Sequence, residues 1–257
     1  MAKNERSPAA DRLLHRHPLQ RLESPSRTVS AVVHIIGLAS FAYSFDYLLS
    51  HPNHIAKDHD SDIVLSSNQS YGWHFQYLTI IGLSLATITF TLGLLADITL
   101  NRQLFLFKNI LSCCSAPMET LITTLYWGLR AIDPELVVPK ELELPLPPDL
   151  SFHLIPTAML LIDLLFLSPP WAISALPALC LSLGIAFTYW FWIELCYTRN
   201  GFYPYPLFAL MDTKQRVGLF VGSALTMTLS TIVLKWLYGK VNGVEDESRP
   251  GSLKKVT

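Results

Sequence analysis

Two side chains in this sequence have the chemical types that a nucleophile and its base require. Thr79 carries a hydroxyl near the start of one long apolar run, and His153 carries an imidazole near the start of another. When two such groups lie within hydrogen-bond reach, the imidazole can take the hydroxyl proton while the oxygen attacks an acyl carbon. The pair therefore indicates acyl transfer or ester hydrolysis, provided that the fold brings both runs to one place.

The composition of the sequence indicates what kind of elements carry these two residues. Of the 257 residues, 51% are hydrophobic and only 15% are charged, with a mean hydropathy of +0.34. A soluble domain normally has about 25% charged residues. The charges gather at the two ends and between long apolar runs, which is typical of a membrane protein. No basic stripe that could follow a phosphate backbone is present, so we expect no nucleic-acid partner.

The apolar runs predict an all-α fold, a polytopic bundle of six transmembrane helices. Most of the predicted spans reach the roughly 20 residues needed to cross about 30 Å of hydrocarbon. Residues 133–149 are rich in proline and acidic groups, so we predict a loop there. We expect a disordered tail over 1–27, a membrane domain over 28–238 and a C-terminal tail over 239–257. The predicted spans are 28–49, 73–100, 104–131, 150–167, 172–197 and 217–238.

The distribution of Lys and Arg predicts the orientation of the bundle. These residues are enriched in both terminal segments and after the second span, which places both termini in the cytoplasm. Lys254 and Lys255 then form a cytosolic dilysine pattern that favours the endoplasmic reticulum membrane. A glycosylation sequon at Asn68 falls on the opposite side. No cleavable signal peptide is evident, so we expect the first span to be an uncleaved anchor.

This topology brings Thr79 and His153 to the same end at similar depth. Thr79 lies one to two turns into the second span, and His153 lies in the first turn predicted for the fourth. A helix N-terminus disfavours imidazolium, so we expect a neutral ring that can accept a proton. Asp149 or Ser151 could cap this helix and help to hold the ring.

Plainer roles compete with these assignments. A threonine in a membrane helix usually bonds to its own backbone, and a histidine at the interface is usually an anchor. The cysteines lie inside apolar runs without metal-binding spacing, which favours packing. They are Cys113, Cys114, Cys180 and Cys196.

Four acidic residues fall inside or at the ends of predicted spans, where an unpaired charge is costly. They are Asp46, Glu119, Asp163 and Glu194. Asp163 lies ten residues beyond His153, or about 15 Å deeper, so it cannot orient that ring directly. Asp46 lies at about the same depth as His153 and could orient its ring. For each acid, the alternative is a protonated or paired structural group.

The remaining histidines carry weaker hypotheses. His51, His54 and His59 share one loop, but their spacing fits no closed metal site, and we expect neither a metal nor a cofactor. His74 precedes Thr79 by five residues and points about 140° away around a helix. It is therefore a weaker candidate for the base than His153.

Several stretches, read in order, resemble the androgen-induced and androgen-dependent tissue-factor-pathway-inhibitor-regulating family of multispanning membrane proteins, of which this chain would be a divergent member. The resemblance covers roughly residues 30–240. The stretches are Tyr71-Gly72, Phe75 to Thr79, Leu95-Ala96-Asp97, Tyr126-Trp127, Asp133-Pro134-Glu135, Pro139-Lys140, His153 followed by a proline and Asp163, and Gly201 to Pro206.

The resemblance implies a six-helix hydrolase that cleaves fatty acid esters of hydroxy fatty acids. The family's nucleophilic threonine matches Thr79, and its basic histidine matches His153. The lipid ester would enter from the bilayer, and no cofactor would be needed. Tyr126, Trp127 or His74 could stabilise the oxyanion. This chain departs from the family in its long basic N-terminal tail, its extended first loop and a proline nearer to His153.

A competing hypothesis is a noncatalytic carrier or regulatory membrane protein, in which buried acids line a path or bind a partner. Against it, the two halves show no inverted repeat and no pair of helices broken by Gly or Pro. A serine hydrolase is disfavoured because the sequence has no GxSxG motif.

Overall fold

The computed structural model describes residues 26–51, 55–57, 64–66, 69–138, 143–171 and 173–242. Long helices make up most of this part of the chain, and β1 pairs antiparallel with β2, with Ala56 opposite Leu65. The elements are α2 (Val29–Ser50), β1 (Ile55–Lys57), β2 (Val64–Ser66), η1 (Trp73–Gln76), α3 (Leu78–Thr99), α4 (Arg102–Ile132), η2 (Pro134–Leu136), α5 (Leu146–His153), α6 (Ile155–Ile162), η4 (Asp163–Leu167), α7 (Ala175–Asn200), α8 (Pro206–Ala209) and α9 (Thr213–Asn242).

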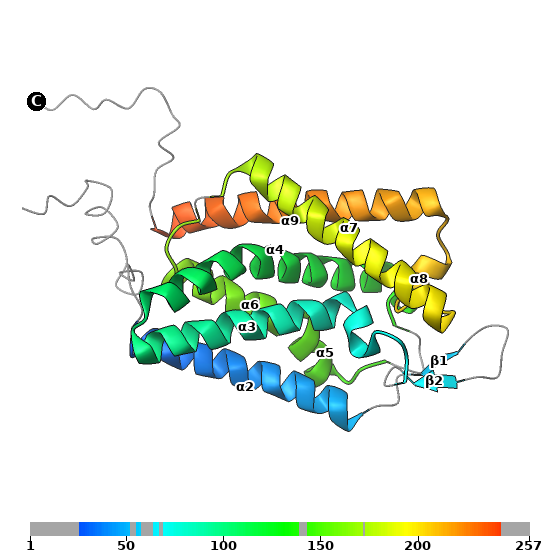
Figure 1. The fold of residues 1–257 in the computed structure, drawn as a ribbon, viewed down its shortest axis with the longest axis horizontal. Helices are drawn as coiled ribbons and strands as arrows, with labels where there is room; N and C mark the ends of the chain where they lie inside the picture. Colours follow the sequence, from blue (N-terminus) through cyan, green and yellow to red (C-terminus); the bar gives the residue numbers. More distant parts are fainter. Residues whose placement is uncertain are drawn as a thin grey trace, which may run out of the picture.

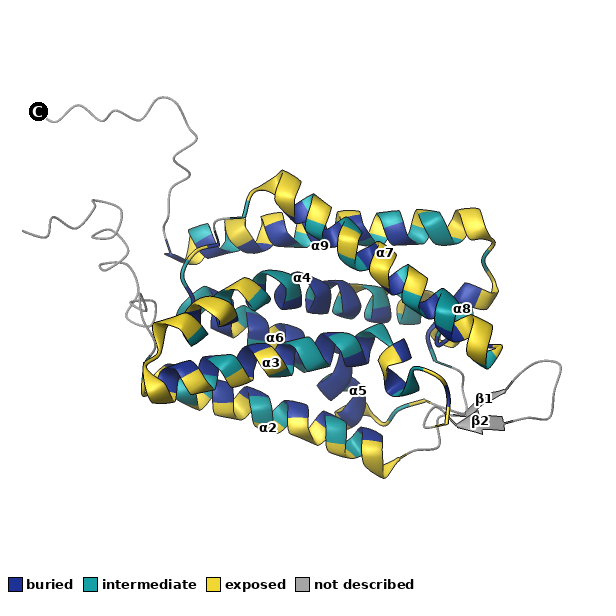
Figure 2. Ribbon diagram, in the orientation of Figure 1, coloured by how far each residue is buried: buried dark blue, intermediate teal, exposed yellow. Residues whose placement is uncertain are grey.

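The helices form an elongated bundle with α3 and α4 at its centre (Figure 1). Helix α2 lies along α3, while α7 and α9 cover the other side of α4. Helix α2 begins and α9 ends at one end of the bundle, which we call the terminal end. The end where α3 begins, and where α4 finishes, is called the distal end. Figure 2 shows that the middle parts of α3 and α4 are mostly buried or intermediate, whereas the outer faces of α2, α7 and α9 are exposed.

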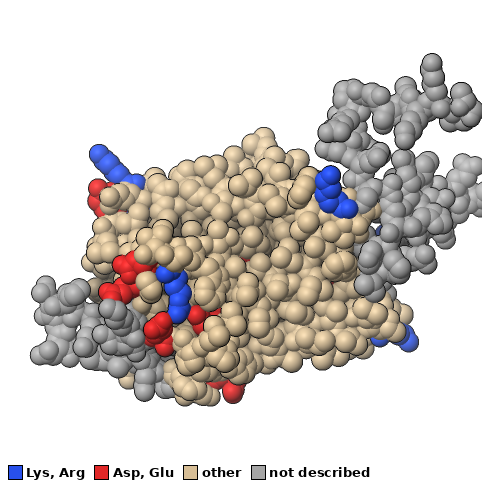
Figure 3. All heavy atoms as spheres, turned by 180° about the vertical axis from the view of Figure 1, so that it is seen from behind, with Lys and Arg blue, Asp and Glu red and all other residues tan. Residues whose placement is uncertain are grey.

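Membrane-spanning character is clear for most of the long helices. Four of them, α2, α3, α7 and α9, are long and apolar enough to cross a bilayer. A fifth span results if α5 and the α6–η4 segment, bent by 44° against each other, count as one. Helix α4 is not among these because charged and hydroxyl side chains interrupt its 31 residues. On the face in Figure 3, charged atoms lie toward the two ends and the broad middle is uncharged.

The predicted fourth span differs most from the structure. It begins at Leu146, inside the segment predicted as a loop, and breaks at Leu154 between α5 and α6. Pro156 explains the break, because its ring has no N–H to donate and crowds the carbonyl four residues earlier. The hydroxyl of Thr123 on α4 donates to the carbonyl of His153 at 2.6 Å, which satisfies that acceptor beside the break. As predicted, the span ends just before Ser168.

Helices α3 and α4 are joined by a very tight turn. Only Leu100 and Asn101 separate them, and Leu100 has the left-handed φ of 55° that non-glycine residues rarely adopt. The Asn101 side chain caps α4 by accepting a hydrogen bond from the Gln103 amide at 2.8 Å. The turn therefore fixes α3 and α4 as an antiparallel pair.

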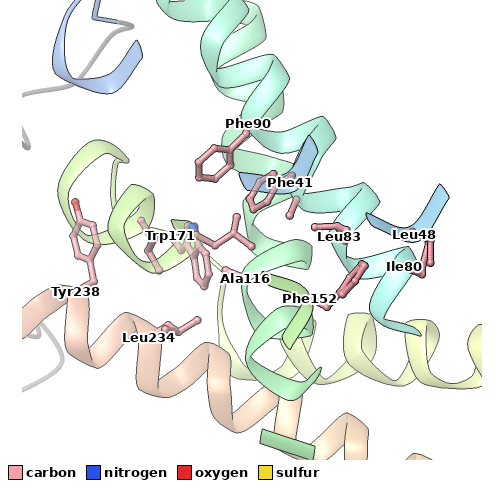
Figure 4. Close-up of a cluster of buried hydrophobic side chains, with 13 residues drawn as sticks. Phe41, Leu48, Ile80, Leu83, Phe90, Ala116, Phe152, Trp171, Leu234 and Tyr238 are labelled. Carbon is pink, nitrogen blue, oxygen red and sulfur yellow. The ribbon is translucent and has the colours of Figure 1, made fainter. Parts of the chain in front are cut away.

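Glycines allow α2 and α3 to approach closely, as small residues do in membrane bundles. A Cβ atom at Gly37 on α2 would lie 2.4 Å from the buried ring of Phe90 on α3. Figure 4 shows Phe90 and Phe41 side by side in the main apolar cluster, at a centroid distance of 5.3 Å. The α2–α3 contact is thus packed tightly around the Phe90 ring.

Replacing Gly37 by alanine is expected to destabilise the bundle by about 1–3 kcal/mol, because the new methyl group overpacks this contact. Thermal unfolding of the purified protein in detergent measures the effect. Gly184→Ala on α7 is the matched control, since nothing lies within 4 Å of a Cβ there. Equal unfolding temperatures for the two variants would contradict this account of α2–α3 packing.

Candidate functional site

A largely apolar cavity opens between α3, α4, α7 and α9 in the distal half of the bundle. The space inside it that a water-sized sphere can occupy is about 100 Å³. Among the described residues, the hydroxyl groups on its wall belong to Thr79, Tyr126, Tyr189, Tyr205 and Ser223. The cavity therefore fits a ligand that is mostly hydrocarbon and has few polar atoms.

Thr79 lies on this wall, in the first turn of α3. Other threonines of α3, such as Thr87, donate to the carbonyl four residues earlier. The Thr79 side chain instead interacts with the hydroxyl of Tyr205. The same Tyr205 oxygen accepts from the Leu78 amide at 3.1 Å. Burial raises the pKa of Tyr205, so this residue is a neutral phenol at physiological pH. Tyr205 thus holds both the start of α3 and the Thr79 side chain.

His153 is held by a chain of polar contacts at the distal end. Its Nδ1 lies 2.9 Å from Oδ1 of Asp149, one helical turn earlier. The other carboxylate oxygen accepts from Arg130 at 2.7 Å. Because a carboxylate only accepts hydrogen bonds, the ring donates from Nδ1. No described residue hydrogen-bonds to Nε2. In the neutral form of the ring, Nε2 therefore has a free lone pair that can accept a proton.

Tyr126 connects His153 with the cavity. Its ring stacks on the imidazole, with centroids 3.4 Å apart and planes 5° from parallel, and the same residue lines the cavity with Thr79. The Tyr126 hydroxyl accepts from Arg130 at 2.9 Å. Within the described residues, no hydrogen bond joins Thr79 to His153. The structure places both at the distal end and gives them Tyr126 as a shared neighbour.

The structure differs from three expectations about the residues around the candidate site. This residue ends α5 instead of starting a helix, so the argument from a helix N-terminus is wrong. Asp46 is exposed on α2 and is not the partner of the ring, whereas Asp149 is. His74 is buried in η1 against Trp73, at a centroid distance of 4.6 Å, and is not part of the cavity wall.

Asp163 belongs to a different cluster, at the terminal end. It accepts from Lys108 at 2.6 Å, and His34 Nε2 lies 3.2 Å from the same oxygen. His34 Nδ1 lies 2.8 Å from Asp97, and Lys108 donates also to Ser168 at 2.7 Å. Of the alternatives left open by the sequence, the paired structural group is the one observed. Lys108 is one of the basic residues after the second predicted span that were used to predict the orientation, but it is fully buried within α4.

The other two acids have contrasting environments. Glu194 accepts hydrogen bonds from Trp190, Tyr203 and Arg216 at 3.0–3.1 Å and so ties α7 to α9. Burial and the contact with Glu194 raise the pKa of Tyr203 to about 12, so Tyr203 stays a donor at neutral pH. Glu119 is fully buried, and its oxygens have no hydrogen-bond partner among the described residues.

Some predicted features fall outside the described residues. These are His54, His59, the Asn68 sequon, Lys140 and the Lys254–Lys255 pair, together with residues 1–25 and 243–257. In the described ranges, no group of three or more His, Cys, Asp or Glu side chains is arranged to hold a metal ion.

Apolar helices, a buried histidine–aspartate pair and a largely apolar cavity together define a polytopic membrane protein with an internal pocket. Comparison of the sequence with known families narrows this class. Residues 29–239 match the family described as FAR-17a/AIG1-like protein, and the chain belongs to that family. The resemblance seen in the sequence is thereby confirmed.

Two relatives extend over most of the chain. A UPF0641 membrane protein of Schizosaccharomyces pombe is 36% identical over 217 residues, which cover 84% of this chain and 92% of the relative. The androgen-induced gene 1 protein of Homo sapiens is 25% identical over 197 residues, covering 68% of this chain and 78% of the relative. No solved structure matches the chain.

Proposed function

We propose that this protein is an intramembrane lipid hydrolase that cleaves fatty acid esters of hydroxy fatty acids, with Thr79 as nucleophile and His153 as base. The observation that carries the proposal is the position of Thr79 on the wall of a largely apolar cavity. The family resemblance supports the same pair of residues, and the contact of His153 with Asp149 supports its role as the base.

The reaction would proceed in two steps. Thr79 Oγ attacks the ester carbonyl while its proton passes to Nε2 of His153, directly or through one water. The tetrahedral intermediate then expels the alcohol oxygen, which takes that proton, and an acyl-threonine remains. Water, deprotonated by His153, attacks this second ester; the fatty acid is released, and His153 returns the proton to Thr79 Oγ. Tyr126 and Tyr205 line the cavity, and their hydroxyl groups could stabilise the oxyanion.

The proposal also includes the number of membrane spans and the side of the membrane on which the termini lie. Because α2 begins and α9 ends at the terminal end, the chain crosses the bundle an even number of times. An even number of crossings supports a sixth span beside the five candidates, and we assign it to α4 at the centre of the bundle. We propose six spans in the endoplasmic reticulum membrane with both termini in the cytoplasm, which places the cavity toward the lumen.

A direct test combines turnover with trapping of the intermediate. The protein purified in detergent is incubated with a fatty acid ester of a hydroxy fatty acid, and free fatty acid is measured over time. A quenched sample is digested, and the peptide with Thr79 is examined for the added acyl mass. Hydrolysis with acylation of Thr79 is expected. Absence of hydrolysis in pure, folded protein would reject the enzyme and favour the noncatalytic carrier or regulatory protein.

Replacing Asp149 by asparagine is expected to lower kcat by about 10²-fold with little change in KM. The amide can accept or donate at this position, so it no longer fixes the Nδ1–H form that leaves Nε2 free. Steady-state kinetics with the same ester measures the change. Glu143→Gln is the matched control because Glu143 is an exposed second partner of Arg130, 2.7 Å away, and should leave kcat unchanged. Similar kcat values for both variants would refute the role of Asp149.

A further inference from the structure

We propose that Met118 and Met227 close the inner end of the cavity and set the longest acyl chain that the protein accepts. This inference rests on the proposed function, because it places the ester carbonyl at Thr79. It goes beyond that function by dividing the cavity into two arms. Each arm takes one of the two hydrocarbon parts of the ester.

The register of α3 against α4 places Thr79 within the length of the cavity. A Cβ atom at Gly82 would lie 2.6 Å from Ile122 and 2.6 Å from Glu119, so these parts of the two helices are level. Thr79 precedes Gly82 by three residues in the antiparallel α3. Thr79 is therefore about 4.5 Å nearer the distal end, level with α4 between Ile122 and Leu125.

The cavity extends in both directions from this level. Along α4 its wall runs from Met118 to Leu129. From the level of Thr79 the inner arm extends about 8 Å to Met118, and the outer arm extends about 8 Å to Leu129. A carbonyl held at Thr79 thus has room for hydrocarbon on both sides.

The polarity of the substrate decides which part enters which arm. A hydroxy fatty acid has a free carboxylate, whose burial in the hydrocarbon interior is costly. The outer arm leads to Val137 and Leu207, outside the ends of the long helices at the distal end, where a carboxylate can reach water. The unsubstituted acyl chain therefore occupies the inner arm.

Two methionines end the inner arm. Met118 on α4 and Met227 on α9 belong to one buried cluster with Leu121 and Ile122, and both are less than 5% exposed. No described residue of α4 before Met118, or of α9 after Met227, lines the cavity. The side chains at these two positions therefore limit how far an acyl chain can extend.

The experiment measures chain-length preference with esters of one hydroxy fatty acid and saturated acyl chains of increasing length. Met227→Trp is expected to lower kcat/KM for the longest accepted chain, relative to the shortest, by roughly 10-fold. Met227→Ala, which enlarges the arm, is expected to shift the preference toward longer chains. Leu225→Trp is the matched control because Leu225 lies on the same helix and is 54% exposed. An unchanged profile in both Met227 variants would overturn the inference.

A binding measurement separates failure of this inference from failure of the proposed function. Saturated fatty acids of the same lengths are added to the purified proteins, and the rise in unfolding temperature is recorded. Wild type that binds fatty acids but hydrolyses no ester, with shorter chains favoured in Met227→Trp, would reject the hydrolase and keep the acyl arm. Hydrolysis that falls equally for all lengths in Met227→Trp, with no change in binding preference, would reject the arm and keep the hydrolase.

Discussion

Replacing Thr79 by valine is expected to lower kcat for ester hydrolysis at least about 10³-fold, because the variant lacks the oxygen that attacks the carbonyl. Valine has nearly the shape of threonine, and Thr79 is a buried wall residue whose side chain interacts with Tyr205. Packing should therefore change little. Hydrolysis of the hydroxy-fatty-acid ester by purified protein, with unfolding temperature as a check on folding, measures the effect.

The control for this prediction lies on the same helix. The hydroxyl of Thr87 donates to the Leu83 carbonyl at 2.7 Å and is not on the cavity wall, so Thr87→Val should retain activity. Thr79→Ser keeps a nucleophilic oxygen and should retain a measurable fraction. Full activity in Thr79→Val would exclude Thr79 as the nucleophile, even if the protein proves to be a hydrolase.

Replacing Lys108 by methionine is expected to destabilise the protein by about 3–5 kcal/mol, the usual cost of leaving one member of a buried ion pair without its partner. Lys108 and Asp163 are both fully buried at the terminal end, with a hydrogen bond of 2.6 Å between them. After the change, His34 would be the remaining basic partner of that carboxylate among the described residues. Thermal unfolding in detergent reports the loss.

A double variant distinguishes loss of the pair from loss of packing. Lys108→Met combined with Asp163→Leu removes both charges and should be more stable than Lys108→Met alone. Lys240→Met is the matched control, because Lys240 is exposed on α9 and its removal should change stability by less than about 1 kcal/mol. A double variant less stable than both single variants would mean that the two residues do not act as a pair.

Hydropathy predicted the long elements because a helix in lipid must be continuously apolar on its outer face. The predicted first, second, third, fifth and sixth spans correspond to α2, α3, α4, α7 and α9, with ends shifted by a few residues. The break at Leu154 was missed, although its signal was present. Pro156 follows His153 closely, and a proline inside an apolar run indicates a kink.

The partners of the polar residues were harder to predict than the helices. Asp149 and His153 are four residues apart, a spacing that puts two side chains on one face of a helix. Their contact could therefore have been predicted from the sequence. The contacts of Asp163 with Lys108 and His34 join residues far apart in the chain. Helix rotation decides such contacts, and a single sequence does not reveal it. Sequence reasoning also missed Tyr205, which only the tertiary fold brings to Thr79.

The tight turn between α3 and α4 has a consequence for how the protein is made. Helix α4 carries Lys108, Glu119 and Arg130. It should insert into the membrane poorly by itself, since a charged side chain near the middle of a helix opposes its transfer into the bilayer by several kcal/mol. Helix α3 is strongly apolar, and Leu100 and Asn101 alone connect it to α4. We therefore expect the translocation machinery to release the two helices into the bilayer together, as a preformed hairpin in which α3 brings α4 along.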